Sequence, residues 1–467
     1  MRPVEWHAAR WDGAPRESRP VAPTTKALLT LMNDPVRPFP WIGLLTLGTA
    51  IFFMVTSEFL PTGLLPQIAG DLDVSEAQVG LLVTIFAGTV VLTTAPLAAL
   101  TRRFDRKHLI LVVLVVFAIA NVGAALAPDY GLLVVARVLG GLAHGLFWAV
   151  AGAYAGYLVP KHQIARAVAV TSGGGTVAFV LGVPAGTALG TAVGWRASFF
   201  VIAGIVAVLM LAVVRFLPAV EHRQSLATGE ISLPARRDPT FPSVLFICLL
   251  VLIVVGGQNV FYTYIAPYLI DSVGFAEVSV GGLLFVYGGA GAIGLVLAGF
   301  LGSRFPRGGL YGMLTVVIVA VTAIGLAAGV PFLVVVLLFL WGAAFGGIPA
   351  LLQTRLLHAA SARVRDIGAA LLTTAFNIGI GGGAAIGGFL FPIIPTPSLA
   401  FVQAAIIGFG LALLIVVDLL RRRREKLGGR APVDDADAEQ SSVPLVTGSI
   451  MLPEHPGRTQ HDRHDAR

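Results

Sequence analysis

The sequence predicts an all-α polytopic membrane protein with twelve transmembrane helices, arranged as two six-helix halves that repeat in parallel. Three observations predict this class: few charged residues, long apolar runs, and basic residues confined to one side of those runs. Of the 467 residues, 56% are hydrophobic and 12% are charged, and the mean hydropathy is +0.85. A soluble domain carries about 25% charged residues, so this composition excludes a large soluble enzyme and a disordered chain.

Twelve runs along the chain are long and apolar enough to cross a membrane. A transmembrane helix needs about 20 mostly apolar residues, whereas a β-barrel strand would be about ten residues of alternating character. Only Pro128–Tyr130 separates the third and fourth runs, but 108–158 is too long for one crossing. The expected spans are 41–65, 77–100, 108–127, 131–158, 166–191, 197–217, 243–270, 277–302, 310–328, 331–358, 366–391 and 397–420.

The basic residues predict the orientation of these spans. Of the 32 Lys and Arg residues, 30 lie in the two tails and in alternate connections, which face one side. Arg196 lies on the other side, and Arg137 lies within a span. By the positive-inside rule, both termini are expected in the cytoplasm of a multi-pass protein in the cell inner membrane. The net charge of +7 therefore reflects topology and predicts no nucleic-acid partner.

The span positions divide the chain into five expected segments. These are a disordered cytoplasmic tail (1–40), a first half (41–217), a cytoplasmic linker (218–242), a second half (243–420) and a disordered tail (421–467). The first tail has no apolar core and no cleavage site, so we interpret it as cytoplasmic and not as a signal peptide. A single cysteine, Cys248, excludes a disulfide framework and a multi-cysteine metal site. We expect no cofactor and no metal.

An internal repeat appears when the chain is shifted by 201 residues. The match Arg103-Phe104 with Arg304-Phe305, at the border of a span, is the most specific. Other residues that coincide with an identical residue at this shift are Thr62, Pro66, Val79, Gly80, Gly88, Arg106, Gly141, Gly145, Gly182 and Gly186. Each half contains six spans, so the repeat is parallel.

Several motifs resemble a known family. Thr56–Phe59, followed by Gly63–Pro66, resembles the first span of the drug:proton antiporter branch of the major facilitator superfamily. The segments that are similar to bacterial sugar efflux transporters are Ala143–Trp148, Leu181–Gly186, Gly194–Arg196 and Phe376–Gly381. The resemblance covers about residues 41–420 and implies the major facilitator fold, with one site between two halves that work by alternating access.

Three ionisable residues within spans are candidates for proton coupling, because such residues are expensive in a membrane. Glu58 is the only acidic residue well inside a span, and we expect it to carry the proton; the alternative is a permanent structural pair with Arg. Arg137 lies at a similar depth, and it either pairs with Glu58 or extends to the outer interface. His144 lies near the midplane. It either relays protons or lines the cavity, or it makes a simple contact between helices.

Polar and aromatic residues elsewhere in the spans are candidates for solute binding. They are Trp148, Asn259, Tyr262, Tyr264, Gln353 and Asn377. Asn259 is the repeat partner of Glu58, which places an amide where the first half has a titratable group. We expect Glu58, His144 and these residues, Tyr264 apart, to surround one central cavity.

These features predict a monomeric secondary transporter and no enzyme activity. The partners expected are a small-molecule solute, protons and the lipid bilayer. The favoured solutes are sugars or sugar-like neutral compounds, exported against inward proton flow; the alternatives are a multidrug or amphenicol-type antibiotic exporter, a facilitative importer, and a non-transporting receptor or scaffold. No GxxxxGK[ST] motif occurs, so the chain encodes no ATP-driven motor, and no HExxH motif of a metalloprotease occurs.

Overall fold

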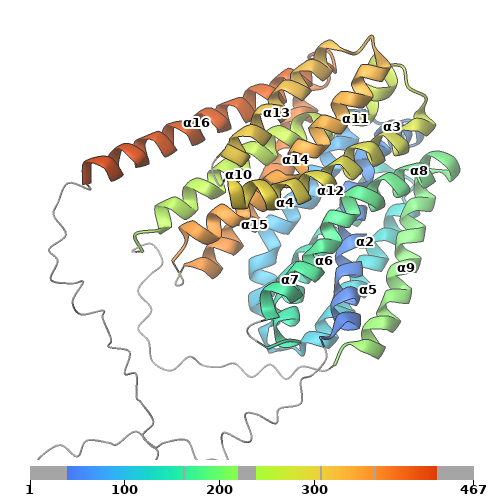
Figure 1. Ribbon diagram of the computed structural model, residues 1–467. Helices are drawn as coiled ribbons and strands as arrows, with labels where there is room; N and C mark the ends of the chain where they lie inside the picture. Colours follow the sequence, from blue (N-terminus) through green and yellow to red (C-terminus); the bar gives the residue numbers. More distant parts are fainter. Residues whose placement is uncertain (1–38, 161–162, 219–237, 306–307, 362–363, 429–467) are drawn as a thin grey trace, which may run out of the picture. The chain divides into compact units, whose positions relative to one another are not determined.

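The computed structural model describes residues 39–160, 163–218, 238–305, 308–361 and 364–428. Within these ranges the regular structure is helical, and no strand forms (Figure 1). Twelve of the described helical segments are long and apolar enough to cross a membrane, judged by length and composition. The predicted fold class is therefore confirmed.

The first half begins with Trp41 and ends with Phe216. Ser75 and Gln78 form a capping box at the start of the second span, and Asp105 and Asp129 cap the next two spans through their side chains. The helices are α2 (Trp41–Gly63), α3 (Leu65–Asp71), α4 (Glu76–Leu100), η1 (Thr101–Arg103), α5 (Arg106–Ala125), α6 (Tyr130–Tyr157), α7 (Ile164–Val177), η3 (Ala178–Gly182), α8 (Val183–Val193) and α9 (Trp195–Phe216).

The second half follows the same order of spans. We call the end of the spans at which α2 begins the basic end, and the end at which α2 finishes the opposite end. The helices are α10 (Phe241–Tyr262), α11 (Ile265–Pro267), η5 (Tyr268–Ser272), η6 (Glu277–Ser279), α12 (Val280–Arg304), α13 (Gly308–Leu326), α14 (Pro331–Ala359), α15 (Arg365–Leu390) and α16 (Ser398–Gly428).

The first span of each half breaks at the same place, which corrects the continuous runs expected at 41–65 and 243–270. Helix α2 ends at Gly63 and α3 starts at Leu65, whereas α10 ends at Tyr262 and α11 starts at Ile265. Pro66 and Pro267 follow these breaks, 201 residues apart. A proline has no N–H to bond the carbonyl four residues earlier, which weakens the helix at this point.

Close helix crossings also repeat between the halves. Gly141 of α6 lies against the backbone carbonyl of Phe86 in α4. Gly342 of α14 lies against the carbonyl of Tyr287 in α12, and both members of this pair are 201 residues further along the chain. Glycine permits this approach because it has no Cβ, so the predicted repeat has a structural counterpart.

The same geometry predicts a contrast between two adjacent glycines of α15. A Cβ on Gly383 would overlap the backbone carbonyl of Gly256 in α10, whereas a Cβ on Gly382 would meet nothing within 4 Å. Gly383→Ala is therefore expected to cost roughly 1–3 kcal/mol through overpacking. Gly382→Ala is the matched control and should leave the melting temperature of the purified protein unchanged or raised. Equal melting temperatures for the two variants would contradict this packing.

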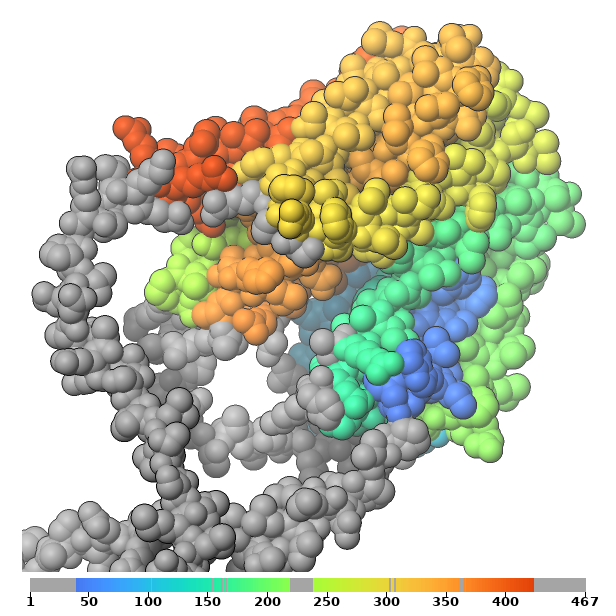
Figure 2. Space-filling model, viewed as in Figure 1, coloured from blue at the N-terminus to red at the C-terminus, as the bar shows by residue number. Residues whose placement is uncertain are grey.

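The two halves contact each other through α4 with α15 and through α8 with α12. Thr84 Oγ1 donates to the carbonyl of Gly381 at 2.9 Å, and Gly281 lies close to the carbonyl of Pro184. These contacts lie in the parts of the helices nearer the opposite end. Figure 2 shows a hollow between orange α15 and teal α7.

The last helix extends beyond the expected span. Residues up to Leu411 belong to one compact unit, and Ala412 begins a second unit. Helix α16 continues through Arg421 to Gly428, so residues 421–428 are helical where a disordered tail was expected. The remainder of that tail, residues 1–38 of the first tail and residues 219–237 of the linker lie outside the described residues.

Candidate solute cavity and buried ionisable cluster

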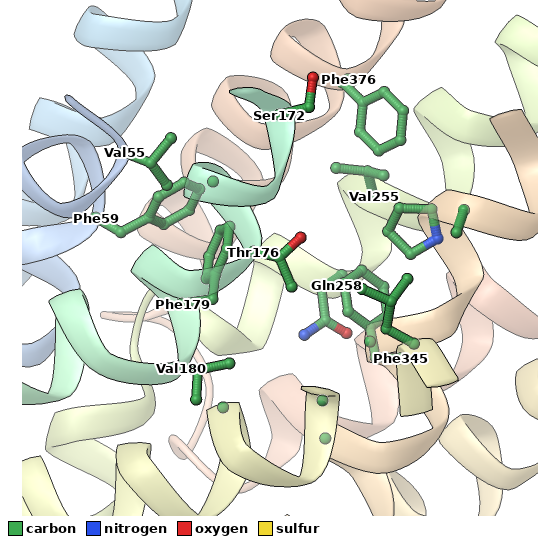
Figure 3. A pocket seen from close by; sticks show the side chains of 18 of the residues that line it. Val55, Phe59, Ser172, Thr176, Phe179, Val180, Val255, Gln258, Phe345 and Phe376 are labelled. Carbon is green, nitrogen blue, oxygen red and sulfur yellow. The ribbon is translucent and has the colours of Figure 1, made fainter. Parts of the chain in front are cut away.

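A cavity of about 550 Å³ lies between the two halves. This volume falls within the range of pockets that bind small molecules. Figure 3 shows Val55 and Phe59 of α2 on one side and Phe376 of α15 on the other, with Thr176 and Gln258 between them. None of the described residues that line the cavity carries a charge at neutral pH. The lining thus suits an uncharged solute with a substantial apolar part.

The structure divides the predicted site residues into two groups. The residues that line the cavity are Trp148, Asn259, Tyr262 and Gln353. The residues absent from its lining are Glu58, Arg137, His144, Tyr264 and Asn377. The expectation that Glu58, His144 and Asn377 surround the same cavity is wrong in this conformation.

Glu58, His144 and Arg137 instead form a buried cluster inside the first half. Each of these residues is 3% exposed. Oε2 of Glu58 lies 3.5 Å from Nε2 of His144, and Oε1 of Glu58 has no hydrogen-bond partner among the described residues. At this separation the carboxylate and the imidazole interact electrostatically, and both are groups that can bind a proton. The cluster therefore has the chemistry of a proton-binding site.

Arg137 makes neither of the contacts expected from the sequence. Its guanidinium nitrogens donate to the backbone carbonyls of Ser57 and Glu58, at 2.9 and 2.8 Å, and its side chain lies 4.3 Å above the ring of Phe86. The reason lies in α2, where Pro61 has no N–H to bond the Ser57 carbonyl. Arg137 supplies the missing donor, so it neither bonds the Glu58 carboxylate nor extends to an interface.

Two helices connect the buried cluster with the cavity. His144 and Trp148 lie one turn apart on α6, and their ring centroids are 6.3 Å apart. Trp148 lines the cavity, whereas His144 contacts Glu58. On α2, Val55 precedes Glu58 by one turn and also lines the cavity. A shift of either helix would therefore move both the cluster and the cavity wall.

Tyr264 and Asn377 have structural contacts. The Tyr264 hydroxyl donates to the carbonyl of Ala384 at 3.1 Å, and its ring stacks on Phe391 at 5.0 Å between centroids. Asn377 donates to the carbonyl of Thr373, one turn earlier in α15. The sequence marked both as polar groups within spans but could not show which way they point.

Four polar residues of the cavity wall were missed by the sequence analysis: Ser172, Thr176, Gln258 and Tyr287. Gln258 and Tyr287 both line the cavity, and Gln258 Nε2 donates to the Tyr287 hydroxyl at 2.8 Å. A signal did exist for Gln258, because it is the residue before Asn259 and the repeat partner of Ser57. Among the described residues, no group of three or more His, Cys, Asp or Glu side chains is arranged to hold a metal ion.

A repeated twelve-helix architecture with a central cavity defines the class of polytopic membrane transporters. The chain belongs to the Major Facilitator Superfamily, whose family model matches residues 47–381 and 247–452. It is similar to a crystal structure described as a bacterial homolog to human lysosomal transporter, Spinster, in inward-facing and occupied conformation. That match has a TM-score of 0.66 at 18% identity and covers 82% of this chain and 98% of the other.

The inward-facing and unoccupied form of that bacterial homolog is also similar to this chain. Its TM-score is 0.63 at 18% identity, over 82% of this chain and 96% of the other. At this level of identity, the likeness extends to the fold.

Proposed function

We propose that this protein is a proton-coupled secondary transporter that exports small, neutral, amphipathic solutes by alternating access. The observation that carries the proposal is the uncharged cavity between the halves, next to a buried carboxylate–imidazole pair. Contacts between the halves near the opposite end, together with the hollow between α15 and α7 in Figure 2, fit one of the two states that alternating access requires.

The lining of the cavity supports amphipathic solutes over free sugars. Most of its surface is apolar, with Phe59, Phe179 and Phe345 among the contributors, and polar groups form the smaller part. A polyhydroxylated sugar would leave many hydroxyls without partners in such a site, which costs about 1–3 kcal/mol for each unsatisfied group. The amphenicol-type antibiotics, which carry a ring and a few polar groups, fit better than the sugars favoured by sequence.

Proton coupling is supported by the contrast between the two halves. The first half holds Glu58 and His144 in its interior, whereas the second half has Asn259 at the position that corresponds to Glu58. Only the first half therefore has a titratable group at this level of the repeat. A proton bound there would change the charge beside α2 and α6, which also form the cavity wall.

The positive-inside pattern supports a cytoplasmic basic end, and the cavity would then open toward the cytoplasm in this conformation. Loading from the cytoplasm is the starting point of an export cycle. Inward proton movement through the cluster would then drive the return step, with the solute released on the outside.

Transport into inverted membrane vesicles with an imposed pH gradient tests this proposal. With the vesicle interior acidic by about one pH unit, one-to-one exchange supports about tenfold accumulation, because about 1.4 kcal/mol is a factor of ten. Radiolabelled chloramphenicol is expected to accumulate and radiolabelled lactose to remain at the level of protein-free vesicles. Accumulation of lactose alone would overturn the solute class, and no response of either compound to the gradient would overturn the transporter proposal.

A further inference from the structure

The wall of the cavity in the second half contains a hydrogen-bond network centred on Gln258. The indole Nε1 of Trp341 lies 2.9 Å from Gln258 Oε1, and the Tyr287 hydroxyl lies 2.8 Å from Gln258 Nε2. The side-chain amide of Gln403 also lies 2.9 Å from Gln258 Oε1. Gln258 is 2% exposed and Tyr287 is 7% exposed, so this network is held out of water.

The indole of Trp341 determines the direction of these hydrogen bonds. An indole N–H can only donate, and the carbonyl oxygen of Gln258, at 2.9 Å, is its nearest side-chain acceptor. The amide nitrogen of Gln258 therefore points at Tyr287, whose oxygen accepts its proton. The hydroxyl proton of Tyr287 remains available, and among the described residues no acceptor receives it. Tyr287 thus offers one free donor at the cavity wall.

Asn259 offers the complementary group. Its Nδ2 donates to the carbonyl of Val255 at 2.9 Å, which identifies the other side-chain atom as the carbonyl oxygen Oδ1. Oδ1 is buried and has no hydrogen-bond partner, and Asn259 lines the cavity at 4% exposure. A buried acceptor without a partner is costly, so it marks a place where a ligand can supply the missing donor.

The donor and the acceptor lie in one region of the cavity. Asn259 and Tyr262 are three residues apart on the same face of α10. The ring of Tyr262 lies 5.1 Å from that of Tyr287, and the ring of Trp341 lies 4.9 Å from Tyr287, measured between centroids. A solute placed here would have aromatic surface beside two polar contacts of opposite kind.

We infer that Tyr287 and Asn259 together recognise a secondary amide, or an equivalent neighbouring donor and acceptor, attached to an aromatic ring. The Tyr287 hydroxyl donates to the solute's carbonyl oxygen, and Asn259 Oδ1 accepts from its N–H. Gln258 positions Tyr287 by donating a hydrogen bond to its hydroxyl oxygen, which leaves the hydroxyl proton of Tyr287 for the solute. This inference rests on the proposed function, because it specifies the solute class of the same cavity.

Three two-ring probes that differ in their linker separate the two contacts in binding measurements on the purified full chain in detergent. N-benzylbenzamide has a donor and an acceptor, its N-methyl derivative has only the acceptor, and bibenzyl has neither. In the wild-type protein, each lost contact is expected to weaken binding about fivefold, the usual worth of one neutral hydrogen bond. This comparison needs no variant, so it stands even where a substitution disturbs folding.

Two variants then assign the contacts to residues. Tyr287→Phe is expected to weaken both amides about fivefold and to leave bibenzyl unchanged. Asn259→Leu should weaken N-benzylbenzamide alone, because the N-methyl derivative has no proton for Oδ1. Tyr130→Phe is the control. The hydroxyl that it removes donates to the backbone carbonyl of Gln78 in α4, and none of the described lining residues belongs to α4. This variant should bind all three probes as the wild type does.

Equal affinities of the three probes in the wild type would overturn the inference, as would an equal loss for all probes in Tyr287→Phe. The proposed function fails separately: if vesicles show no gradient-driven transport but the binding pattern holds, the recognition site stands and the transporter proposal does not.

Discussion

Glu58→Gln is expected to abolish accumulation of solute driven by a pH gradient, while solute binding persists. Glutamine keeps the size of the side chain and an oxygen to face His144, but it cannot take up or release a proton. Accumulation should fall to the level of protein-free vesicles, a loss of about tenfold for a gradient of one unit. Downhill exchange of labelled for unlabelled solute should continue, because the cavity lies outside the cluster.

Glu277→Gln is the matched control for this experiment. Glu277 lies in η6 at the opposite end, so the variant removes a carboxylate without affecting the buried cluster. It should accumulate solute as the wild type does. If Glu58→Gln accumulates solute at the wild-type rate and with the same pH dependence, Glu58 is not the proton carrier, and His144 becomes the residue to test.

Arg137→Met is expected to destabilise the protein by about 3 kcal/mol, because it leaves the buried Ser57 carbonyl without a donor and Glu58 without a nearby cation. Methionine keeps an unbranched apolar side chain but removes the guanidinium, so the loss reports on the missing hydrogen bonds together with the missing cation–π contact to Phe86. The measurement is thermal unfolding of the purified protein. Arg215→Met, at an exposed position near the end of α9, is the control and should change stability by less than about 0.5 kcal/mol.

A second substitution shows whether Arg137 acts through the gap left by Pro61. Pro61→Ala returns the N–H that can bond the Ser57 carbonyl within α2. In the Arg137→Met background it should recover part of the lost stability. A double variant that is less stable than Arg137→Met alone would contradict the explanation given for this arginine.

The fold could be predicted from sequence because its signals are local. Apolar runs of the length of a membrane set the number of spans, and identical residues 201 positions apart showed the repeat. The breaks after Gly63 and Tyr262 were missed because apolar residues resume directly after each of them, so each run looked continuous. Pro66 and Pro267, in matching positions, were the signal that could have located both breaks.

The site was harder to predict because it depends on which way a side chain points. Asn259 and Tyr262 share a face of α10, but Tyr264 follows the break and falls on another side. Asn377 lies one residue after Phe376, and on a helix one residue is enough to turn a side chain off the cavity wall. Polarity within a span could not distinguish these cases, since their orientation is set by tertiary packing.

The contact of Arg137 shows the same limit. Glu58 and Arg137 lie at similar depth, which suggests an ion pair. The Ser57 carbonyl in α2, however, lacks a helical donor because Pro61 has no N–H, and Arg137 bonds that carbonyl. Checking each backbone carbonyl of α2 for a hydrogen-bond donor would have shown, from the sequence, that the Ser57 carbonyl lacks one. The distance to the Glu58 carboxylate depends on how α2 and α6 pack, which no local pattern contains.

Proton movement driven by a solute gradient tests the central claim most directly. Wild-type protein is reconstituted in liposomes that hold a pH-sensitive dye, with the membrane potential clamped at zero and no initial pH difference. When chloramphenicol is added outside, its downhill entry should drive protons out and make the interior alkaline, and Glu58→Gln liposomes should show no change. An interior pH that stays constant while labelled solute enters the wild-type liposomes would contradict proton-coupled transport.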